Sequence, residues 1–194
     1  DRYTTLKGLP AGDYADKIYN EYFRAAVLEA DEDYWPAHVA AGMFSLSKHR
    51  VKTAAADFQA ALRLNKRAPM ALVGMGVVHL AAHHYEKCIQ QADAALKINP
   101  KLDQGHLLKA YCYMQWKKFD EVMPLVDKVL EVNPRHIEAL SLAAAVHMRT
   151  YEPDKARPYV ERVEAVDANN ARVHLAIGEW MTSARQFEQA EKHF

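Results

Sequence analysis

The five residues Ala61-Leu62-Arg63-Leu64-Asn65 decide the fold, because close variants of this stretch return at a fixed interval. The variants are Ala-Leu-Lys-Ile-Asn at 95–99, Val-Leu-Glu-Val-Asn at 129–133 and Val-Glu-Ala-Val-Asp at 163–167, each 34 residues after the one before. A period of this length that never slips is typical of a stacked-repeat architecture. The sequence therefore predicts a linear array of similar repeats.

Other residues keep the same period and predict that each repeat is a pair of helices. Apolar residues recur at three- and four-residue spacing, which is the period of an amphipathic helix. They do so in first helices at 39–46, 71–80, 106–114, 139–148 and 173–181, and in second helices at 54–64 and 88–98. Small residues at two repeat positions let the paired backbones approach closely: Gly42, Gly76, Ala110, Ala144 and Gly178, and then Ala54, Cys88, Ala156 and Ala190.

Two prolines help to place the helix boundaries. Pro124 and Pro158 occupy the same position in the third and fourth repeats. We expect both to fall within about the first turn of a second helix, where a missing N–H costs little.

These features resemble the tetratricopeptide repeat family, whose unit is a helix–turn–helix with a second helix ending in an Ala-Leu-x-Leu-Asp/Asn-Pro-like run. The match covers residues 35–194 without a gap. Lys66 and Ala168 replace the closing proline in two repeats, so we expect looser turns there. The resemblance implies an all-α fold, a right-handed superhelical solenoid of antiparallel helix-turn-helix hairpins.

The same register divides the chain into six segments. We expect an irregular lead-in and an N-terminal half-hairpin helix (from Asp13 to about Ala30) at 1–34, four repeats at 35–68, 69–102, 103–136 and 137–170, and a shortened fifth repeat at 171–194. Because the chain starts at Asp1 without a Met and stops inside a second helix, we expect it to be a fragment of a longer protein.

Composition and motifs argue against several function classes. Lys and Arg number 25, as do Asp and Glu, so the basic excess typical of a nucleic-acid partner is missing. No apolar run approaches the roughly 18 residues of a membrane span, so we expect no membrane insertion. The chain has no His-Glu-x-x-His, phosphate loop or Gly-x-Ser-x-Gly motif. We therefore expect no enzyme activity and no cofactor.

The histidines are candidates for a metal site, which we consider and disfavour. His38, His106 and His174 share one repeat position, and His79 and His147 share another. No single first helix carries histidine at both positions, and neighbouring first helices lie roughly 10 Å apart. We expect no metal site, and we interpret these histidines as amphipathic residues packed between helices.

The candidate site follows from the resemblance, because in this family the first helices line a concave groove that binds extended peptides or partner helices. The matching positions in this chain are Val39, Met43, Leu46, Met70, Val73, Val77, Leu80, Leu107, Tyr111, Met114 and Arg149. Family members that grip a carboxylate terminus need Lys and Asn where this chain has Val39, Met43, Val73 and Val77. Apolar side chains offer a carboxylate no hydrogen-bond donors, so that activity is disfavoured.

The predicted partner is a protein or peptide with an apolar face, such as an amphipathic helix. Two alternatives leave the groove without an external partner: its residues pack against neighbouring helices, or another segment of the same chain fills it. A further hypothesis is that the chain positions substrates or partners for a larger enzyme whose catalytic domain lies elsewhere. Self-association through the apolar groove is also possible.

Overall fold

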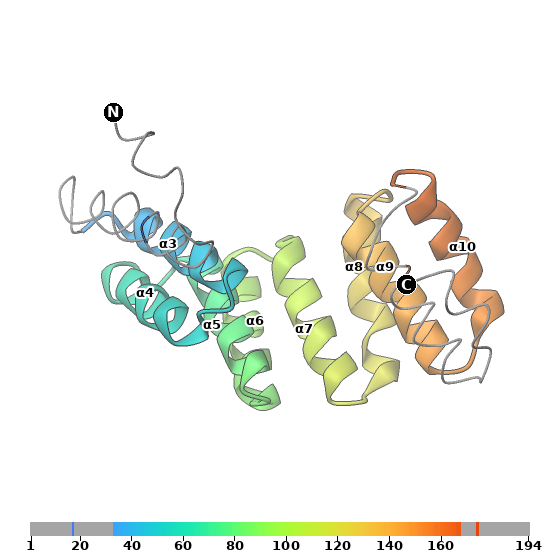
Figure 1. The fold of residues 1–194 in the computed structure, drawn as a ribbon, viewed down its shortest axis with the longest axis horizontal. Coiled ribbons are helices and arrows are strands. Elements are labelled where there is room, and N and C mark those ends of the chain that lie inside the picture. The colour runs from blue at the N-terminus through green and yellow to red at the C-terminus, as the bar shows by residue number, and fades with distance from the viewer. Residues whose placement is uncertain (1–16, 18–32, 168–173, 175–194) are drawn as a thin grey trace. The chain divides into compact units, whose positions relative to one another are not determined.

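The structure is a computed structural model that describes residue 17, residues 33–167 and residue 174. Over these residues it contains α-helices, one short 3-10 helix and no strand (Figure 1). The half-hairpin helix predicted at 13–30 and most of the shortened repeat at 171–194 lie outside the described residues. The chain divides into two compact units, Asp1–Pro100 and Lys101–Phe194, which we call unit 1 and unit 2.

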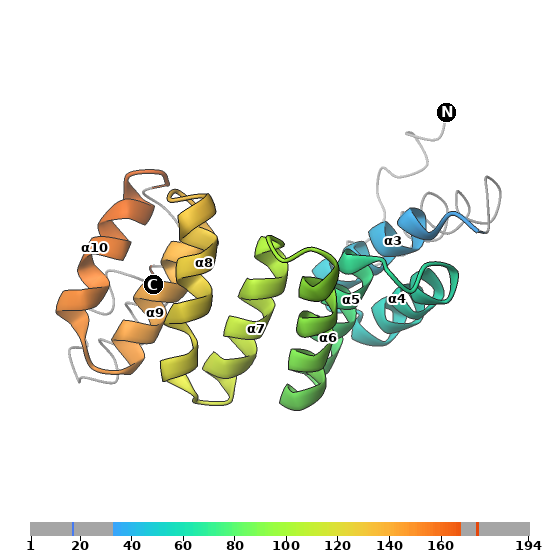
Figure 2. The same cartoon turned by 180° about the vertical axis from the view of Figure 1, so that it is seen from behind.

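The described residues of unit 1 form two helical hairpins. They are formed by α3 (Trp35–Ser47) with α4 (Val51–Leu64) and by α5 (Pro69–Ala81) with α6 (Tyr85–Ile98), as Figures 1 and 2 show. Helix α4 also packs against α5, and α3 touches α5. Pro36 is the second residue of α3, and Pro69 is the first residue of α5. The fixed φ of proline suits a helix start, and these two helices begin a few residues before their apolar pattern does.

Phe58 is at the centre of the unit 1 core and has none of its surface exposed. It packs with small residues and one methionine, namely Ala54, Ala61, Ala68, Ala71 and Met75. A Cβ atom placed on Gly42 would lie 2.6 Å from the Phe58 ring, and one on Gly74 would lie 2.3 Å from it. Both distances are too short for real contacts, so the ring requires glycine on α3 and on α5.

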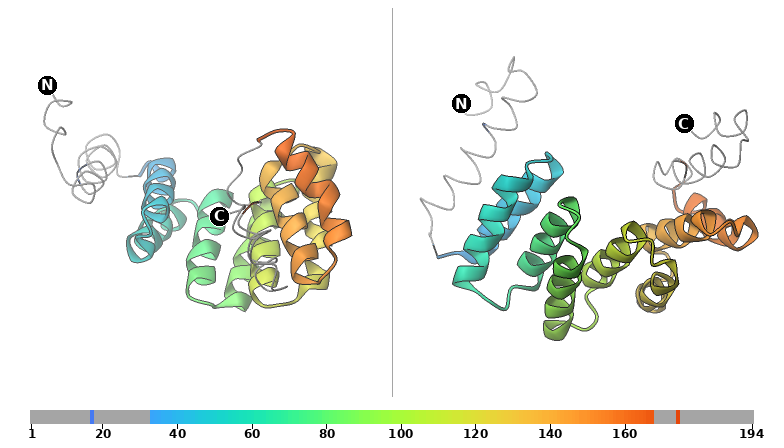
Figure 3. Two further views of the ribbon diagram at one scale, coloured as in Figure 1. Left: turned by 45° about the vertical axis from the view of Figure 1, so that its right-hand side comes forward. Right: turned by 90° about the horizontal axis from the view of Figure 1, so that it is seen from below.

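Between residues 101 and 167, unit 2 forms two more hairpins. The first joins α7 (Asp103–Gln115), the 3-10 helix η3 (Phe119–Glu121) and α8 (Met123–Val132), and the second joins α9 (Ile137–Arg149) and α10 (Pro153–Glu164). Helix α8 packs against α9, and α9 lies beside α10, which the left view of Figure 3 shows. The all-α stack of antiparallel hairpins is thus confirmed within each unit.

The core of unit 2 is built from medium-sized aliphatic residues. One cluster joins α7, α8 and α9 and includes Leu107, Ala110, Val126 and Leu142. A second cluster joins α9 and α10 and consists of Leu140, Ala144, Met148, Ala156, Val160 and Val163. No single aromatic side chain dominates either cluster.

The two prolines of the second helices differ in their placement. Pro124 stands at the start of α8, as predicted. The prediction for Pro158 was wrong, because this residue lies inside α10. Pro153 already starts α10, so Pro158 comes in its second turn, where an N–H would otherwise bond within the helix.

Each hairpin turn contains a residue in the left-handed backbone region, and none of the four is glycine. They are His49, His83, Lys117 and Tyr151, with φ of 57° or 61°, at the 34-residue period. In the first turn, the amide of His49 donates to Leu46 O at 2.9 Å and that of Arg50 donates to Ser45 O at 2.9 Å. This is a Schellman motif, which satisfies the last carbonyl groups of a helix.

The asparagines of the repeated stretch close the connection to the next hairpin. Asn65 Oδ1 accepts from the amide of Arg67 at 2.9 Å, and Asn133 Oδ1 accepts from the amide of Arg135 at 3.1 Å. Lys66 follows the first asparagine and a proline follows the second, yet both turns have this bond. The expectation of a looser turn at Lys66 was therefore wrong, because the asparagine side chain and not the proline closes the turn. Ala168 lies outside the described residues.

Candidate protein-binding surface

In unit 1, the predicted groove residues of α3 form the edge of its core. Val39, Met43 and Leu46 are spaced by four and three residues and so share one face of the helix. All three are half-buried and pack against the cluster around Phe58. They therefore have a structural role and also keep some surface exposed.

Helix α5, which α3 touches, carries the other predicted residues of unit 1. Val73 is only 5% exposed, so it belongs to the core. Met70, Val77 and Leu80 are half-buried. We call the six residues that keep exposed area the first-helix face of unit 1: Val39, Met43, Leu46, Met70, Val77 and Leu80.

In unit 2, the predicted residues form a more polar surface. Leu107 is 4% exposed and Met114 is 7% exposed, and both lie in the core. Tyr111 is half-buried and its hydroxyl donates to Glu138 Oε1 at 3.1 Å, which links α7 to α9. Arg149, the last residue of α9, is exposed. The surface that these residues of unit 2 expose to solvent is therefore polar and consists of Tyr111, Glu138 and Arg149.

Two buried serines lie on first helices without a hydrogen-bond partner for the hydroxyl. Ser141 is 4% exposed and occupies the repeat position that holds Val39 and Val73 in unit 1. Ser45 is fully buried on α3. The hydroxyl oxygens of both serines make no hydrogen bond. Leaving such a group unpaired costs about 1–3 kcal/mol, so neither serine stabilises the fold.

Two described histidines of unit 2, His136 and His147, have hydrogen-bond partners on nearby residues. His147 Nδ1 lies 3.2 Å from Glu152 Oε2, and its ring stacks on Tyr159 with centroids 5.8 Å apart. Burial, with Lys87 and His84 nearby, lowers the pKa of His79. Hydrogen bonds from Lys155 and His147 lower the pKa of Glu152. Within the described part of the chain, no group of three His, Cys, Asp or Glu side chains could hold a metal ion.

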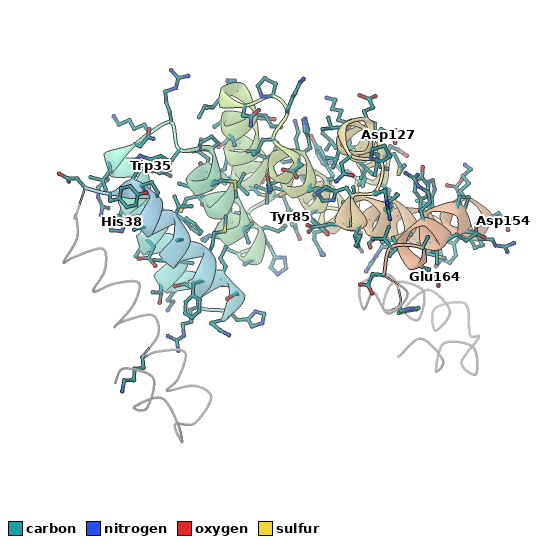
Figure 4. The ribbon with its side chains drawn as sticks, turned by 90° about the horizontal axis from the view of Figure 1, so that it is seen from above. Trp35, His38, Tyr85, Asp127, Asp154 and Glu164 are labelled. Carbon is teal, nitrogen blue, oxygen red and sulfur yellow. The ribbon has the colours of Figure 1, made fainter. Side chains whose placement is uncertain are left out.

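The large apolar side chains that are most exposed lie away from the predicted groove. Leu64, Val132 and Val166 are 40%, 68% and 39% exposed and sit at or just after the ends of second helices. Tyr34 and Tyr151 are also exposed. The exposure of these side chains was not predicted from the sequence, although Leu64, Val132 and Val166 belong to the repeated stretch. Figure 4 shows the side chains, with Trp35 and His38 near the start of α3 and Asp154 and Glu164 at opposite ends of α10.

The helices themselves exclude one further role for the described residues. None of the helices between residues 33 and 167 combines the length and the apolar character that crossing a bilayer requires.

Solved structures similar to this chain are helical-repeat proteins. A thermophilic tetratricopeptide repeat protein of Thermus thermophilus has a TM-score of 0.75 at 16% identity, over 82% of this chain and 87% of its own. A tetratricopeptide repeat protein of Parabacteroides merdae has a TM-score of 0.72 at 14% identity, over 94% of this chain and 72% of its own. The chain has a tetratricopeptide-type fold.

A third similar structure has the same fold. YrrB, described as a tetratricopeptide repeat protein with an unusual peptide-binding site, has a TM-score of 0.59 at 17% identity, over 89% of this chain and 88% of its own. No protein-family model and no curated protein matches the sequence. At these identities the likeness shows the tetratricopeptide-type fold and leaves function to the surfaces of this chain.

Proposed function

We propose that the chain is a protein–protein interaction scaffold that binds an apolar peptide or an amphipathic helix on the first-helix face of unit 1. The observation that carries the proposal is the set of half-buried apolar side chains on two touching helices. The tetratricopeptide-type fold supports it, as does the peptide-binding site named for YrrB.

The spacing of this face suits a helical partner. Val39, Met43 and Leu46 follow one turn after another along α3, and Val77 and Leu80 do so along α5. An amphipathic helix presents apolar anchors at the same three- and four-residue spacing. Met43 and Met70 are unbranched and flexible, so they can adapt to anchors of different shape.

The remaining exposed area limits the affinity. Complete burial of a Val, Leu or Met side chain contributes roughly 1.5–3 kcal/mol, and less than half of that is left for a side chain already half-buried. Six such side chains contribute a few kcal/mol, whereas a millimolar Kd alone corresponds to about −4 kcal/mol. We therefore expect weak and transient binding unless the partner also makes polar contacts.

A charge placed on the face tests the proposal. We expect Val77→Asp to weaken binding of a neutral amphipathic Leu–Gln peptide about tenfold in a fluorescence anisotropy titration, because the carboxylate loses water when the peptide docks. Leu64→Asp is the matched control, since Leu64 is exposed on α4 and lies outside the face. Unchanged affinity for Val77→Asp, or an equal loss for Leu64→Asp, would contradict the proposal.

The variant Tyr111→Asp tests whether unit 2 takes part in binding the peptide. If this variant also weakens binding, residues of unit 2 also take part. If it does not, the first-helix face of unit 1 is sufficient. Light scattering of the peptide-free protein at several concentrations separates peptide binding from self-association.

A further inference from the structure

The hairpin turns of unit 1 meet at one edge of the unit. Three residues separate α3 from α4 and three separate α5 from α6, so each pair runs antiparallel. Because α4 packs against α5 and α3 touches α5, the 48–53 and 82–87 segments lie at the same end of the hairpins (Figure 3, right). We call these two segments, together with His79 at the end of α5, the turn edge of unit 1.

This edge carries an excess of basic residues. Its segments contain Lys48, Arg50, Lys52 and Lys87 against one carboxylate, Glu86. All of these residues are exposed except Arg50, which is half-buried. Asp57 and Asp93 lie further along α4 and α6, in the middle or later turns. The turn edge is therefore positively charged even when its histidines are neutral.

Four histidines lie at the same edge. His49, His83 and His84 are exposed, and His79 is half-buried. His83 Nδ1 lies 3.1 Å from the Tyr85 hydroxyl, and the rings of His79 and His84 are 6.2 Å apart. Histidine is the side chain that generally gains its charge between about pH 8 and 5, so exposed histidines add positive charge to a surface on mild acidification. The lowered pKa of His79 opposes the protonation of that ring.

The matching turns of unit 2 show that this charge does not follow from the fold. Segments 116–121 and 150–155 occupy the same repeat positions and carry Lys117, Lys118 and Lys155 against Asp120, Glu121, Glu152 and Asp154. These two segments contain no histidine, and His147, at the repeat position of His79, is the one histidine beside them. In addition, Glu152 is bound by Lys155 and His147. The repeat thus tolerates balanced charge at these positions, and only unit 1 concentrates bases there.

Two histidines of the turn edge lie in the left-handed region of backbone conformation. His49 and His83 both have φ of 57°. Glycine adopts this conformation freely, whereas other residues do so at a cost of about 1 kcal/mol. The turns of unit 2 share this conformation at Lys117 and Tyr151, so only the imidazole at this position is specific to unit 1.

We propose that the turn edge of unit 1 binds an acidic segment of a partner protein and binds it more tightly at mildly acidic pH. Charge complementarity is the recognition, since exposed lysines, an arginine and histidines attract carboxylates. A nucleic-acid partner is disfavoured because the chain has a formal net charge of +0 and Tyr85, the one aromatic residue of these segments, is half-buried. This proposal uses none of the residues of the first-helix face, so each can fail without the other.

The probe is a fluorescein-labelled Glu–Ser peptide of about twelve residues, titrated with the full chain at pH 7.5 and pH 6.0. We expect about tenfold tighter binding at the lower pH in low salt, and near-complete loss in about 0.5 M salt. The triple variant His49→Gln, His83→Gln, His84→Gln removes the pH dependence. The variant Lys48→Gln, Arg50→Gln, Lys52→Gln weakens binding at both pH values.

The matched control is Lys117→Gln with Lys118→Gln on the turn of unit 2, which leaves affinity unchanged. Circular dichroism of each variant shows that the helices are retained. Equal binding of a Gln–Ser peptide, an equal loss in the unit 2 control, or pH dependence that survives the histidine substitutions overturns the proposal. Tighter binding of a single-stranded oligonucleotide of the same charge also overturns it, because the edge would then be a nucleic-acid surface.

Discussion

The two units fill the same internal interface in opposite ways. In unit 1 the second helix α4 presents Phe58 to a glycine, Gly74, on the next first helix. In unit 2 the same two repeat positions hold Val126 and Leu142, which pack in one cluster. A large residue against glycine and a medium residue against leucine occupy comparable volume. These two interfaces therefore hold a similar total of side-chain atoms, and each unit divides that total differently between the two helices.

The largest expected effect on stability comes from truncating Phe58, the large residue of the unit 1 interface. Phe58→Ala should lower the free energy of unfolding by about 3–5 kcal/mol, because the glycines around the ring cannot fill the cavity. Val126→Ala should cost about half as much, since fewer atoms are removed. Urea unfolding followed by circular dichroism measures both. Equal losses would mean that the two interfaces are packed alike.

The next effect comes from overfilling the interface of unit 1. Gly74→Leu copies the leucine of unit 2, but its Cβ atom alone would lie 2.3 Å from the Phe58 ring. We expect a loss of about 3 kcal/mol in unfolding free energy. Adding Phe58→Val, which completes the unit 2 pair, should recover about 1–2 kcal/mol of it. A double variant no more stable than Gly74→Leu would contradict the volume argument.

The buried serines should behave alike in both units. Ser45→Ala and Ser141→Ala should each raise the free energy of unfolding by about 1 kcal/mol, because a buried hydroxyl without a partner is removed. Ser47→Ala is the control, since its exposed hydroxyl donates to Phe44 O at 2.7 Å. A decrease for either buried serine would show that its hydroxyl has a partner in solution.

The left-handed turn residues should also respond alike. His49→Gly in unit 1 and Lys117→Gly in unit 2 should raise stability by about 0.5–1 kcal/mol, because glycine adopts a positive φ without strain. The neighbouring Ala82 has φ of −92°, so Ala82→Gly should lower stability instead. Thermal melts of the three variants give the comparison, and the same sign for all three would contradict it.

The smallest effect is the response to pH, which differs between the units in its range. The pKa of His79 is lowered from 6.5 and that of Glu152 from 4.5, so both contribute stability at high pH that is lost as pH falls. The His79 contribution disappears first, below about pH 6.5. His79→Gln should flatten the dependence of Tm on pH in that range by less than about 2 °C, and Glu152→Gln should flatten it only below about pH 4.5. A reversed order would contradict the assignment.

Much of the fold could be predicted from the sequence because each repeat forms its helices with the same apolar spacing. The helices that begin at Pro69 and at Met123 fit that pattern. Pro158 was misplaced because a second proline, Pro153, starts the helix earlier. The left-handed turns were not predicted, since His49, His83, Lys117 and Tyr151 lack the glycine that usually marks them.

The candidate site was only partly predictable. The position of a residue in the repeat predicts the helix face on which it lies. How far its side chain is exposed depends on the size of the side chains that pack against it from neighbouring helices. Leu107 and Met114 are therefore core residues, while Val39 at the repeat position of Leu107 and Leu80 at that of Met114 keep surface area. The basic turn edge of unit 1 depends on residues that vary from repeat to repeat, so the shared pattern carries no sign of it.

The packing of the hairpins has a consequence for how the protein is made. Within each unit, α3, α4 and α5 contact one another in sequence order, as do α7, α8 and α9. Contacts between segments close in sequence form quickly, because little chain entropy is lost in closing the loops between them. A hairpin that leaves the ribosome can therefore fold before the next one is synthesised. It then serves as the surface on which its successor assembles.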